Sequence, residues 1–395
     1  MMQIKGKKAL TVLIAAAGIN LVSGIIYCWS IISKELISSL QWTNTEANLP
    51  YAASVLMVAV FMAIGGRLRD IIGPRTNALI GGSLLGAGLF LSSYCTTAYM
   101  MFITYGLVAG IGMGFTGSST TVTAIKWFPA ERRGVVSGIC LSGIALASVY
   151  ISPILNALIA SFGVHKTFQY IGCGAFVVII LLALLLAEPT GAAQQAGPVE
   201  SEWKDTLKKS GFYKLWFMYL LGSSVGLIIL GNIAVIAVRQ AGWEDGFLLV
   251  ILIAVFNGSG RILSGAVSDK IGFRNTFIIA LLAQAVNMIF FNYYRTVRLL
   301  AIGTAVAGFC YGGMISVVPA AVAFEFGTKN LGVNYGLITT AYGVAGIFGP
   351  LMAGRIVDMT GSFHFAFLTS AVMLITAAII ISTLKKRKNL EIVVQ

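Results

Sequence analysis

The sequence contains few charged residues for its length. Asp, Glu, Lys and Arg make up only 10% of the 395 residues, well under half of the usual share, whereas hydrophobic residues make up 57%. This balance excludes a soluble globular domain and a disordered chain. It predicts an integral membrane protein.

Cysteine and histidine are also scarce, and neither occurs in a catalytic or metal-binding pattern. The two histidines lie at expected loop edges, and no C-x-x-C pair is present. A G-x-G-x-x-G match at 112–117 lies inside an apolar run with no preceding strand, which excludes a dinucleotide site. No Ser-His-Asp set or phosphate-binding loop occurs. We therefore expect no enzyme, no metal site, no cofactor and no disulfide among Cys28, Cys95, Cys140, Cys173 and Cys310.

Long apolar runs are what the sequence has in abundance. A bilayer core about 30 Å thick requires about 20 apolar residues per helix, and the runs are continuous rather than alternating. No cleavable signal peptide is expected. Twelve transmembrane helices are predicted, at 9–33, 47–68, 76–94, 99–121, 134–160, 167–187, 212–236, 246–267, 275–294, 299–322, 333–354 and 363–384.

The net charge of +13 follows the predicted topology. With both termini cytoplasmic, twenty of the twenty-seven basic residues fall on the inside and six on the outside. This bias is the positive-inside pattern of membrane proteins. It predicts contact with lipid rather than with nucleic acid, in a multi-pass protein of the inner or plasma membrane.

One long polar stretch, 188–211, divides the spans into six and six, at 1–187 and 212–395. Matching loops suggest that the halves arose by duplication. GRLRDIIGPR (66–75) follows the second span and GAVSDKIGFR (265–274) follows the eighth, with their aspartates 199 positions apart. Each fits G-x-x-x-D-x-x-G-x-R, with the pattern residues Gly66, Asp70, Gly73 and Arg75 in the first copy and Gly265, Asp269, Gly272 and Arg274 in the second.

A second pair of loops repeats at nearly the same distance. RRGVVSG (132–138) and NLGVNYG (330–336) place two glycines each at an offset of 198. An aspartate in a tight glycine turn can accept hydrogen bonds from a helix N-terminus and pair with the nearby arginine. We expect the two loop copies to hold the halves together on one side. The alternative is a solvated charged turn that only obeys topology.

Glycines also recur inside the fourth predicted span. Gly106, Gly110 and Gly114 follow GxxxGxxxG spacing. This spacing predicts a small-residue face for close helix packing.

Arg261 is the one basic residue that topology does not place at a membrane surface, because it lies within the span 246–267. All fourteen acidic residues fall in loops or at helix ends, so none is expected beside it. Ionisable residues inside a membrane usually face a cavity on a substrate path. An unpaired guanidinium there is suited to binding a carboxylate through two parallel hydrogen bonds. The alternative is a side chain that extends to the interface.

The twelve spans, the central polar stretch and the paired G-x-x-x-D-x-x-G-x-R loops resemble the major facilitator superfamily over the whole chain. YCWS (27–30), KWFP (126–129), NGSGR (257–261) and NYGLITTAYG (334–343) are similar to segments of its oxalate/formate antiporter and monocarboxylate transporter group. The resemblance implies two pseudo-symmetric six-helix bundles around a central cavity and transport by alternating access.

The resemblance also implies roles for individual residues. Arg261 aligns with the arginine that binds carboxylate in both related groups. Tyr342, in TAYG, stands where the dicarboxylate exchangers have a lysine, so one fixed charge remains and a monocarboxylate fits better than oxalate. Asn257 stands where animal monocarboxylate transporters have a protonatable aspartate, and Tyr27 falls near their lysine in the first helix.

Tyr27, Asn257, Tyr311 and Tyr342 would supply neutral hydrogen-bond donors to a carboxylate and to a hydroxyl or keto oxygen beside it. Simple helix packing is the alternative for each of them. Two further candidates, with less support, are Tyr150 and Asn232.

We therefore expect a secondary transporter of small monocarboxylates such as L-lactate or pyruvate, coupled to protons by symport. Anion exchange of the oxalate/formate type is the alternative mechanism, in which a counter-anion replaces the proton. A transport-inactive sensor that uses the same pocket is an alternative from another class. The short basic tail KKRKNLEIVVQ provides no obvious signalling domain for such a sensor.

Overall fold

The computed structural model describes residues 2–189, 203–243 and 247–384, and every regular element in these residues is a helix. The first half contains α1 (Met2–Ser23), η1 (Gly24–Cys28), α2 (Trp29–Leu40), α3 (Asn44–Ile72), α4 (Pro74–Ser92), α5 (Ala98–Met101), η2 (Phe102–Ala109), α6 (Gly110–Lys126), η3 (Ala130–Arg132) and α7 (Arg133–Ala183). The second half contains α8 (Trp203–Thr206), α9 (Ser210–Ala241), α10 (Phe247–Ile271), α11 (Phe273–Phe291), α12 (Val297–Phe326), α13 (Leu331–Thr360) and α14 (His364–Ser382).

These elements combine into the twelve predicted spans. The first span is α1, η1 and α2, and the fourth is α5, η2 and α6. The continuous α7 is two helices that meet at Gly163, whose φ of 75° lies in the left-handed region that favours glycine. Ten stretches of the described residues are long and apolar enough to cross a membrane. One of them covers both parts of α7, and α4 supplies the twelfth span.

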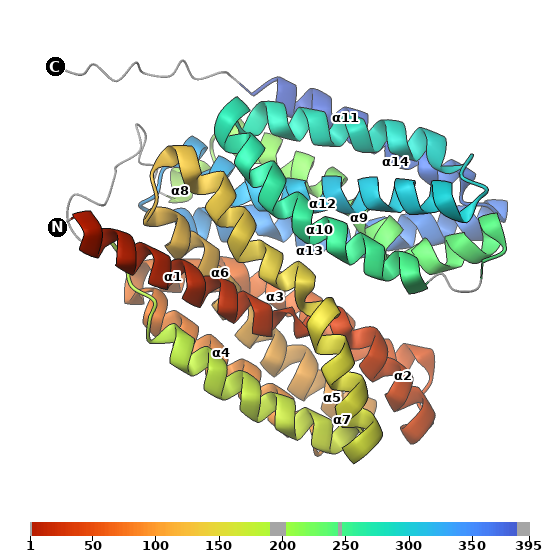
Figure 1. Ribbon diagram of the computed structural model, residues 1–395, viewed down its shortest axis with the longest axis horizontal. Helices are drawn as coiled ribbons and strands as arrows, with labels where there is room; N and C mark the ends of the chain where they lie inside the picture. Colours follow the sequence, from red (N-terminus) through yellow and green to blue (C-terminus); the bar gives the residue numbers. More distant parts are fainter. Residues whose placement is uncertain (1, 190–202, 244–246, 385–395) are drawn as a thin grey trace.

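The two groups of six spans lie side by side, with α1 to α7 in one group and α9 to α14 in the other (Figure 1). The predicted division at 188–211 stays a prediction, because residues 190–202 lie outside the described part of the chain.

Glycine spacing controls packing within the first half, as expected from GxxxGxxxG. A Cβ at Gly106 would lie 2.9 Å from the Ala53 Cβ, and one at Gly110 would lie 2.9 Å from the Ser54 Cα. A Cβ at Gly114 would be equally crowded by α3. The three glycines therefore let η2 and α6 pack directly against the backbone of α3.

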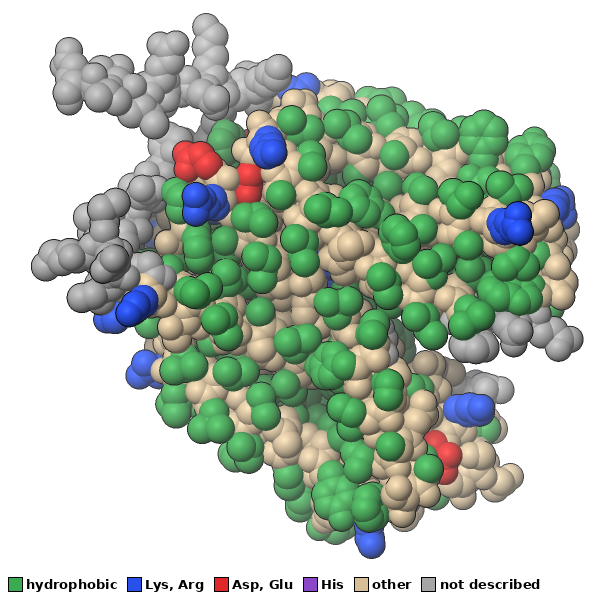
Figure 2. Space-filling model, viewed as in Figure 1, with side chains coloured by type: hydrophobic (Ala, Val, Ile, Leu, Met, Phe, Trp, Pro, Cys, Tyr) green, Lys and Arg blue, Asp and Glu red, His purple; other side chains and the backbone are tan. Residues whose placement is uncertain are grey.

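The halves meet along two helix pairs, α3 with α13 and α7 with α10. The tightest approaches lie at one end of the molecule, which we call the aspartate end because Asp70 and Asp269 lie there. At that end Gly66 packs on the backbone of Gly332, and Gly134 packs on that of Gly265. Figure 2 shows the halves parting toward the opposite end.

Candidate functional site

Arg261 lies on α10 with only 1% of its surface exposed. Its Nε donates a hydrogen bond to the Asn257 Oδ1 at 2.9 Å, one helical turn earlier. A terminal guanidinium nitrogen donates to the backbone carbonyl of Leu141 on α7, in the other half. Among the described residues, no carboxylate forms a salt bridge with Arg261. In the described residues, the hydrogen bonds of the Arg261 guanidinium therefore go to neutral acceptors, an amide oxygen and a backbone carbonyl.

Close packing of α12 on α10 fixes Asn257 in this position. A Cβ at Gly312 would overlap the backbone carbonyl of Asn257 and would lie 2.6 Å from the side-chain Oδ1 of Asn257. A Cβ at Gly260 would overlap the backbone carbonyl of Phe309 in the same way. Because both positions lack a side chain, the helix that carries Tyr311 packs directly against the helix that carries Arg261.

Three tyrosines form a chain of hydroxyl groups between the halves. Tyr311 donates to the Tyr342 hydroxyl at 3.2 Å, and Tyr342 and Tyr27 share a hydrogen bond of 3.3 Å. Tyr27, in η1, belongs to the first half, whereas the other two belong to the second. Tyr27 and Tyr342 are partly exposed, while Tyr311 and Arg261 are buried. The structure thus brings three of the four predicted neutral donors together and places the fourth, Asn257, on Arg261.

The predicted set omitted several side chains that surround this centre. The ring of Tyr219 stacks on that of Tyr342 with centroids 6.1 Å apart. Tyr219 and Tyr335 are both buried near Arg261. The only sequence signal for any of them is that Tyr335 falls within NYGLITTAYG, since buried aromatic residues on apolar helices otherwise resemble ordinary core.

Tyr150 and Asn232 do not join the site. The Tyr150 hydroxyl donates to the carbonyl of Leu21 within the first half. The amide of Asn232 donates at 2.8 Å to the Ile228 carbonyl of its own helix. Each of these hydrogen bonds therefore has its partner in the same half, and neither joins the side chain to Arg261 or to the tyrosine chain.

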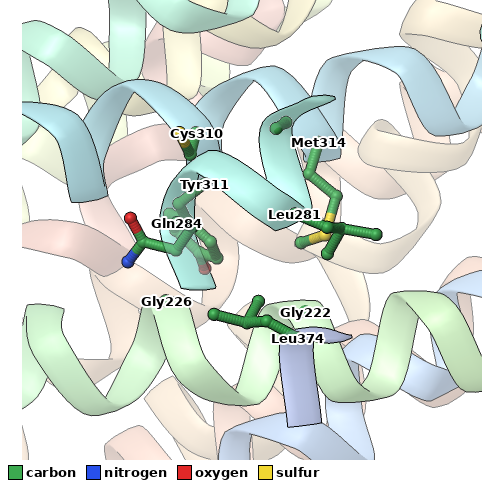
Figure 3. Close-up of a pocket in the computed structure, with 9 residues that line it drawn as sticks. Gly222, Gly226, Leu281, Gln284, Cys310, Tyr311, Met314 and Leu374 are labelled. Atoms are coloured by element: carbon green, nitrogen blue, oxygen red, sulfur yellow. The ribbon is translucent and has the colours of Figure 1, made fainter. Parts of the chain in front are cut away.

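A small apolar pocket lies behind Tyr311, between α9, α11, α12 and α14 (Figure 3). Gly226 faces the Tyr311 ring so closely that any side chain there would displace the ring. Gln284 lines this pocket, its Oε1 accepts from the Asn287 Nδ2 at 3.2 Å, and its buried Nε2 has no hydrogen-bond partner among the described residues. The pocket thus borders the face of Tyr311 that packs within the second half.

At the aspartate end, Asp269 accepts hydrogen bonds from the backbone nitrogens of Gly134 at 2.7 Å and Val135 at 2.8 Å. These nitrogens belong to the first turn of α7, where a carboxylate complements the helix dipole. Asp70 accepts from the Val333 nitrogen at 3.1 Å, in the first turn of α13. Each aspartate therefore contacts a helix N-terminus of the opposite half.

The arginine partners differ from the expectation. Asp70 pairs with its neighbour Arg69 at 2.7 Å, and not with Arg75. Arg75 is exposed because Gly73, with φ at 86°, turns the chain so that this residue lies in the first turn of α4. Arg274 donates to the Ser382 carbonyl instead of pairing with Asp269. The predicted pairing therefore holds in the first copy through Arg69 in place of Arg75, and it is wrong in the second.

Arg69 anchors a larger ionic cluster in the first copy of the motif. It is buried, and it donates to the Thr123 hydroxyl at 3.0 Å and pairs with Glu188. Lys126 approaches the same Glu188 carboxylate at 3.5 Å. In the second copy, the corresponding residue beside Asp269 is Ser268, which carries no charge.

Comparisons with known proteins agree with this architecture. The chain is 28% identical to the oxalate:formate antiporter of Oxalobacter formigenes, over 89% of this chain and 85% of that protein. It is 28% identical to the uncharacterized MFS-type transporter YhjX of Escherichia coli, over 82% of each chain. It is 23% identical to monocarboxylate transporter 13 of Rattus norvegicus, over 92% and 86% of the two chains.

Solved structures share the fold at low sequence identity. The Escherichia coli fucose:proton symporter superposes with a TM-score of 0.75 at 10% identity, covering 94% of this chain and 97% of that one. The proton:xylose symporter XylE also gives 0.75, at 16% identity and 96% coverage of both chains. The family model of the Major Facilitator Superfamily matches residues 9–291 and 237–393. The chain is a membrane transporter that belongs to the major facilitator superfamily.

Proposed function

We propose that this transporter carries small monocarboxylates of the L-lactate or pyruvate type, with Arg261 as the anion site. The observation that carries the proposal is a buried guanidinium whose hydrogen-bond acceptors are an amide oxygen and a backbone carbonyl, with no carboxylate salt bridge from the described residues. A substrate carboxylate would supply the missing negative charge and form shorter, stronger hydrogen bonds than neutral acceptors do.

The surrounding groups favour a substrate with one carboxylate. The hydroxyls of Tyr27, Tyr311 and Tyr342 are neutral, so Arg261 is the only cation in this group of four residues. A second carboxylate would be desolvated without a charged partner, which is unfavourable. Neutral hydroxyls are suited to the hydroxyl or keto oxygen beside a single carboxylate. Relatives named for monocarboxylate transport and for oxalate:formate exchange support an anionic substrate.

Coupling to protons is our first proposal for the driving force. Moving one negative charge inward against a potential of 100 mV costs about 2.3 kcal/mol. Net uptake therefore needs a compensating proton, a counter-anion or a steep gradient. Since Arg261 has no carboxylate partner among the described residues, the proton would travel with the substrate. Exchange for a counter-anion is the alternative, and the similarity to an oxalate:formate antiporter favours it.

The test uses purified protein in liposomes. Uptake of labelled L-lactate is measured with an inward proton gradient, and then with unlabelled lactate or oxalate trapped inside. Wild type is compared with Arg261→Ala and with Arg298→Gln, a control that removes an exposed arginine in the first turn of α12. We expect gradient-driven uptake in wild type and in the control, and its loss in Arg261→Ala.

Other outcomes give different answers. Uptake that requires trapped anion would establish exchange instead of symport. Normal uptake by Arg261→Ala would exclude Arg261 as the anion site. Saturable lactate binding without uptake under any gradient would favour the sensor.

A further inference from the structure

Arg261 belongs to the second half, yet its guanidinium reaches the first. It donates to the Leu141 carbonyl of α7, 120 positions earlier in the chain. The backbones there are nearly in contact, because a Cβ at Gly138 would overlap the carbonyl of Arg261 itself. One turn away, a Cβ at Gly258 would lie 2.9 Å from the Leu146 side chain. The charged group of the site therefore lies in the contact between the halves.

We propose that the hydrogen bond from Arg261 to Leu141 helps to hold the aspartate end closed in the empty transporter, and that substrate binding releases it. This inference rests on the proposed function, because it assigns a second role to the same anion site. The bond joins the halves at the substrate level, whereas the contacts of Asp70 and Asp269 join them at the aspartate end.

The chemistry of the guanidinium explains the release. Its Nε is committed to Asn257 within α10, so the terminal nitrogens remain for partners elsewhere. The bond to Leu141 already has a charged donor, but a carboxylate adds the opposite charge and can accept two parallel hydrogen bonds from one guanidinium. A carboxylate arriving at the terminal nitrogens therefore competes with the neutral Leu141 carbonyl. Substrate replaces a contact between the halves with a contact to one half.

This exchange would couple binding to movement. A ligand shifts a conformational equilibrium only by the difference between its interactions with the two states. Here the empty closed state contains an interaction that the occupied state loses. Loss of the Arg261 side chain should therefore mimic substrate by making the aspartate end open more readily.

The experiment measures the separation of the halves by electron paramagnetic resonance. Spin labels are attached at Arg67→Cys on α3 and Lys270→Cys on α10, two exposed positions at the aspartate end of opposite halves. Cys173→Ser removes the exposed native thiol, since the other four cysteines are buried. Distance distributions are recorded for the full chain without ligand, with L-lactate and with oxalate.

In Arg261→Met, without ligand, we expect the ratio of long to short distances to rise about tenfold, which corresponds to about 1.4 kcal/mol. L-Lactate should shift the wild type in the same direction and leave Arg261→Met unchanged. Ser259→Ala is the matched control, because it removes a hydroxyl on the same helix that donates to the Phe256 carbonyl and leaves the bond from Arg261 to Leu141 in place. It should stay near the wild-type distribution.

An unchanged distribution in Arg261→Met would overturn the inference, and so would an equal shift in Ser259→Ala. If Arg261→Met does not fold, Arg261→Gln replaces it, because its side chain is uncharged and shorter, and a wild-type distribution in that variant counts against the inference. A shift in Arg261→Met with no response of the wild type to either anion would support the contact between the halves and reject the proposed substrate class.

Discussion

Tyr27 and Tyr342 lie 315 positions apart in the chain and face each other across the two halves, with their hydroxyl oxygens 3.3 Å apart. Both are partly exposed, whereas Arg261 is almost fully buried. A substrate that enters from the open end should therefore meet this pair before it reaches the guanidinium.

Removing the Tyr342 hydroxyl should weaken transport without unfolding the protein. In Tyr342→Phe both hydroxyl contacts disappear while the ring stays stacked on Tyr219. We expect the KM for L-lactate to rise roughly tenfold, in keeping with one or two lost hydrogen bonds. Uptake kinetics in liposomes would show it. Tyr170→Phe, at an exposed position, is the matched control and should behave as wild type. An unchanged KM in Tyr342→Phe would mean that the Tyr342 side chain contributes only packing.

Replacing Asn257 by aspartate should make uptake depend more steeply on pH. The substitution places a carboxylate where an amide oxygen now lies 2.9 Å from the Arg261 Nε. When ionised, the introduced carboxylate would compete with the substrate for the same cation. Protonation removes that competition, so uptake by Asn257→Asp should increase as pH falls, more than in wild type. Initial rates across a pH series provide the measurement, and parallel profiles would contradict the prediction.

Closure at the aspartate end should be sensitive to added methyl groups. A Cβ at Gly138 would overlap the Arg261 carbonyl, whereas one at Gly174 would meet no atom within 4 Å. Gly138→Ala should therefore separate α7 from α10 and abolish most transport, while Gly174→Ala should be tolerated. Overpacking of this kind typically costs about 1–3 kcal/mol. Uptake rates and thermal unfolding temperatures of both variants test this prediction. Equal values for the two variants would mean that transport does not need the close packing of Gly138 on Arg261.

Loss of the Asp269 carboxylate should open the aspartate end. Asp269→Ala leaves two backbone nitrogens of α7 without their acceptor. Unmade hydrogen bonds to such groups cost about 1–3 kcal/mol each. We expect an introduced cysteine at Ser268 to react with a maleimide at least tenfold faster in Asp269→Ala than in the parent, a ratio that corresponds to about 1.4 kcal/mol. The control is Asp205→Ala, which removes an exposed carboxylate of a local pair on α8. Equal labelling rates would contradict the prediction.

Much of the fold could be predicted because a bilayer imposes simple rules on sequence. Runs of about 20 apolar residues mark spans whatever their neighbours are. The repeated loops at 66–75 and 265–274 predicted contacts between the halves on one side, and Asp70 and Asp269 make them. Sequence alone also singled out Arg261, because a charge inside an apolar run has few structural explanations.

The partners of these residues were harder to predict, since they depend on tertiary packing. Leu141 contributes a backbone carbonyl to Arg261, and a carbonyl has no signature in sequence. Arg75 belongs to the repeated pattern, yet Arg69 holds Asp70, because the turn at Gly73 fixes which arginine points inward. In the sequence, Tyr219 resembles an ordinary buried core residue. Only the folded structure shows that the Tyr342 ring of α13 stacks on it.

The short 3₁₀ segment η1 turns Tyr27 toward the second half while Cys28 and Trp29 keep their contacts within the first. Before it, Asn20 donates to the Cys140 carbonyl at 2.8 Å and Ser23 shares a hydrogen bond with Thr116, all within the first half. Within this more tightly wound segment, Tyr27 faces the second half. A 3₁₀ helix has about 3.0 residues per turn against about 3.6 for an α-helix, so its five residues add about 100° of rotation. Rewinding η1 into α-helix would turn Tyr27 away from Tyr342 and also shorten the segment by about 2.5 Å, since the rise falls from about 2.0 to about 1.5 Å per residue.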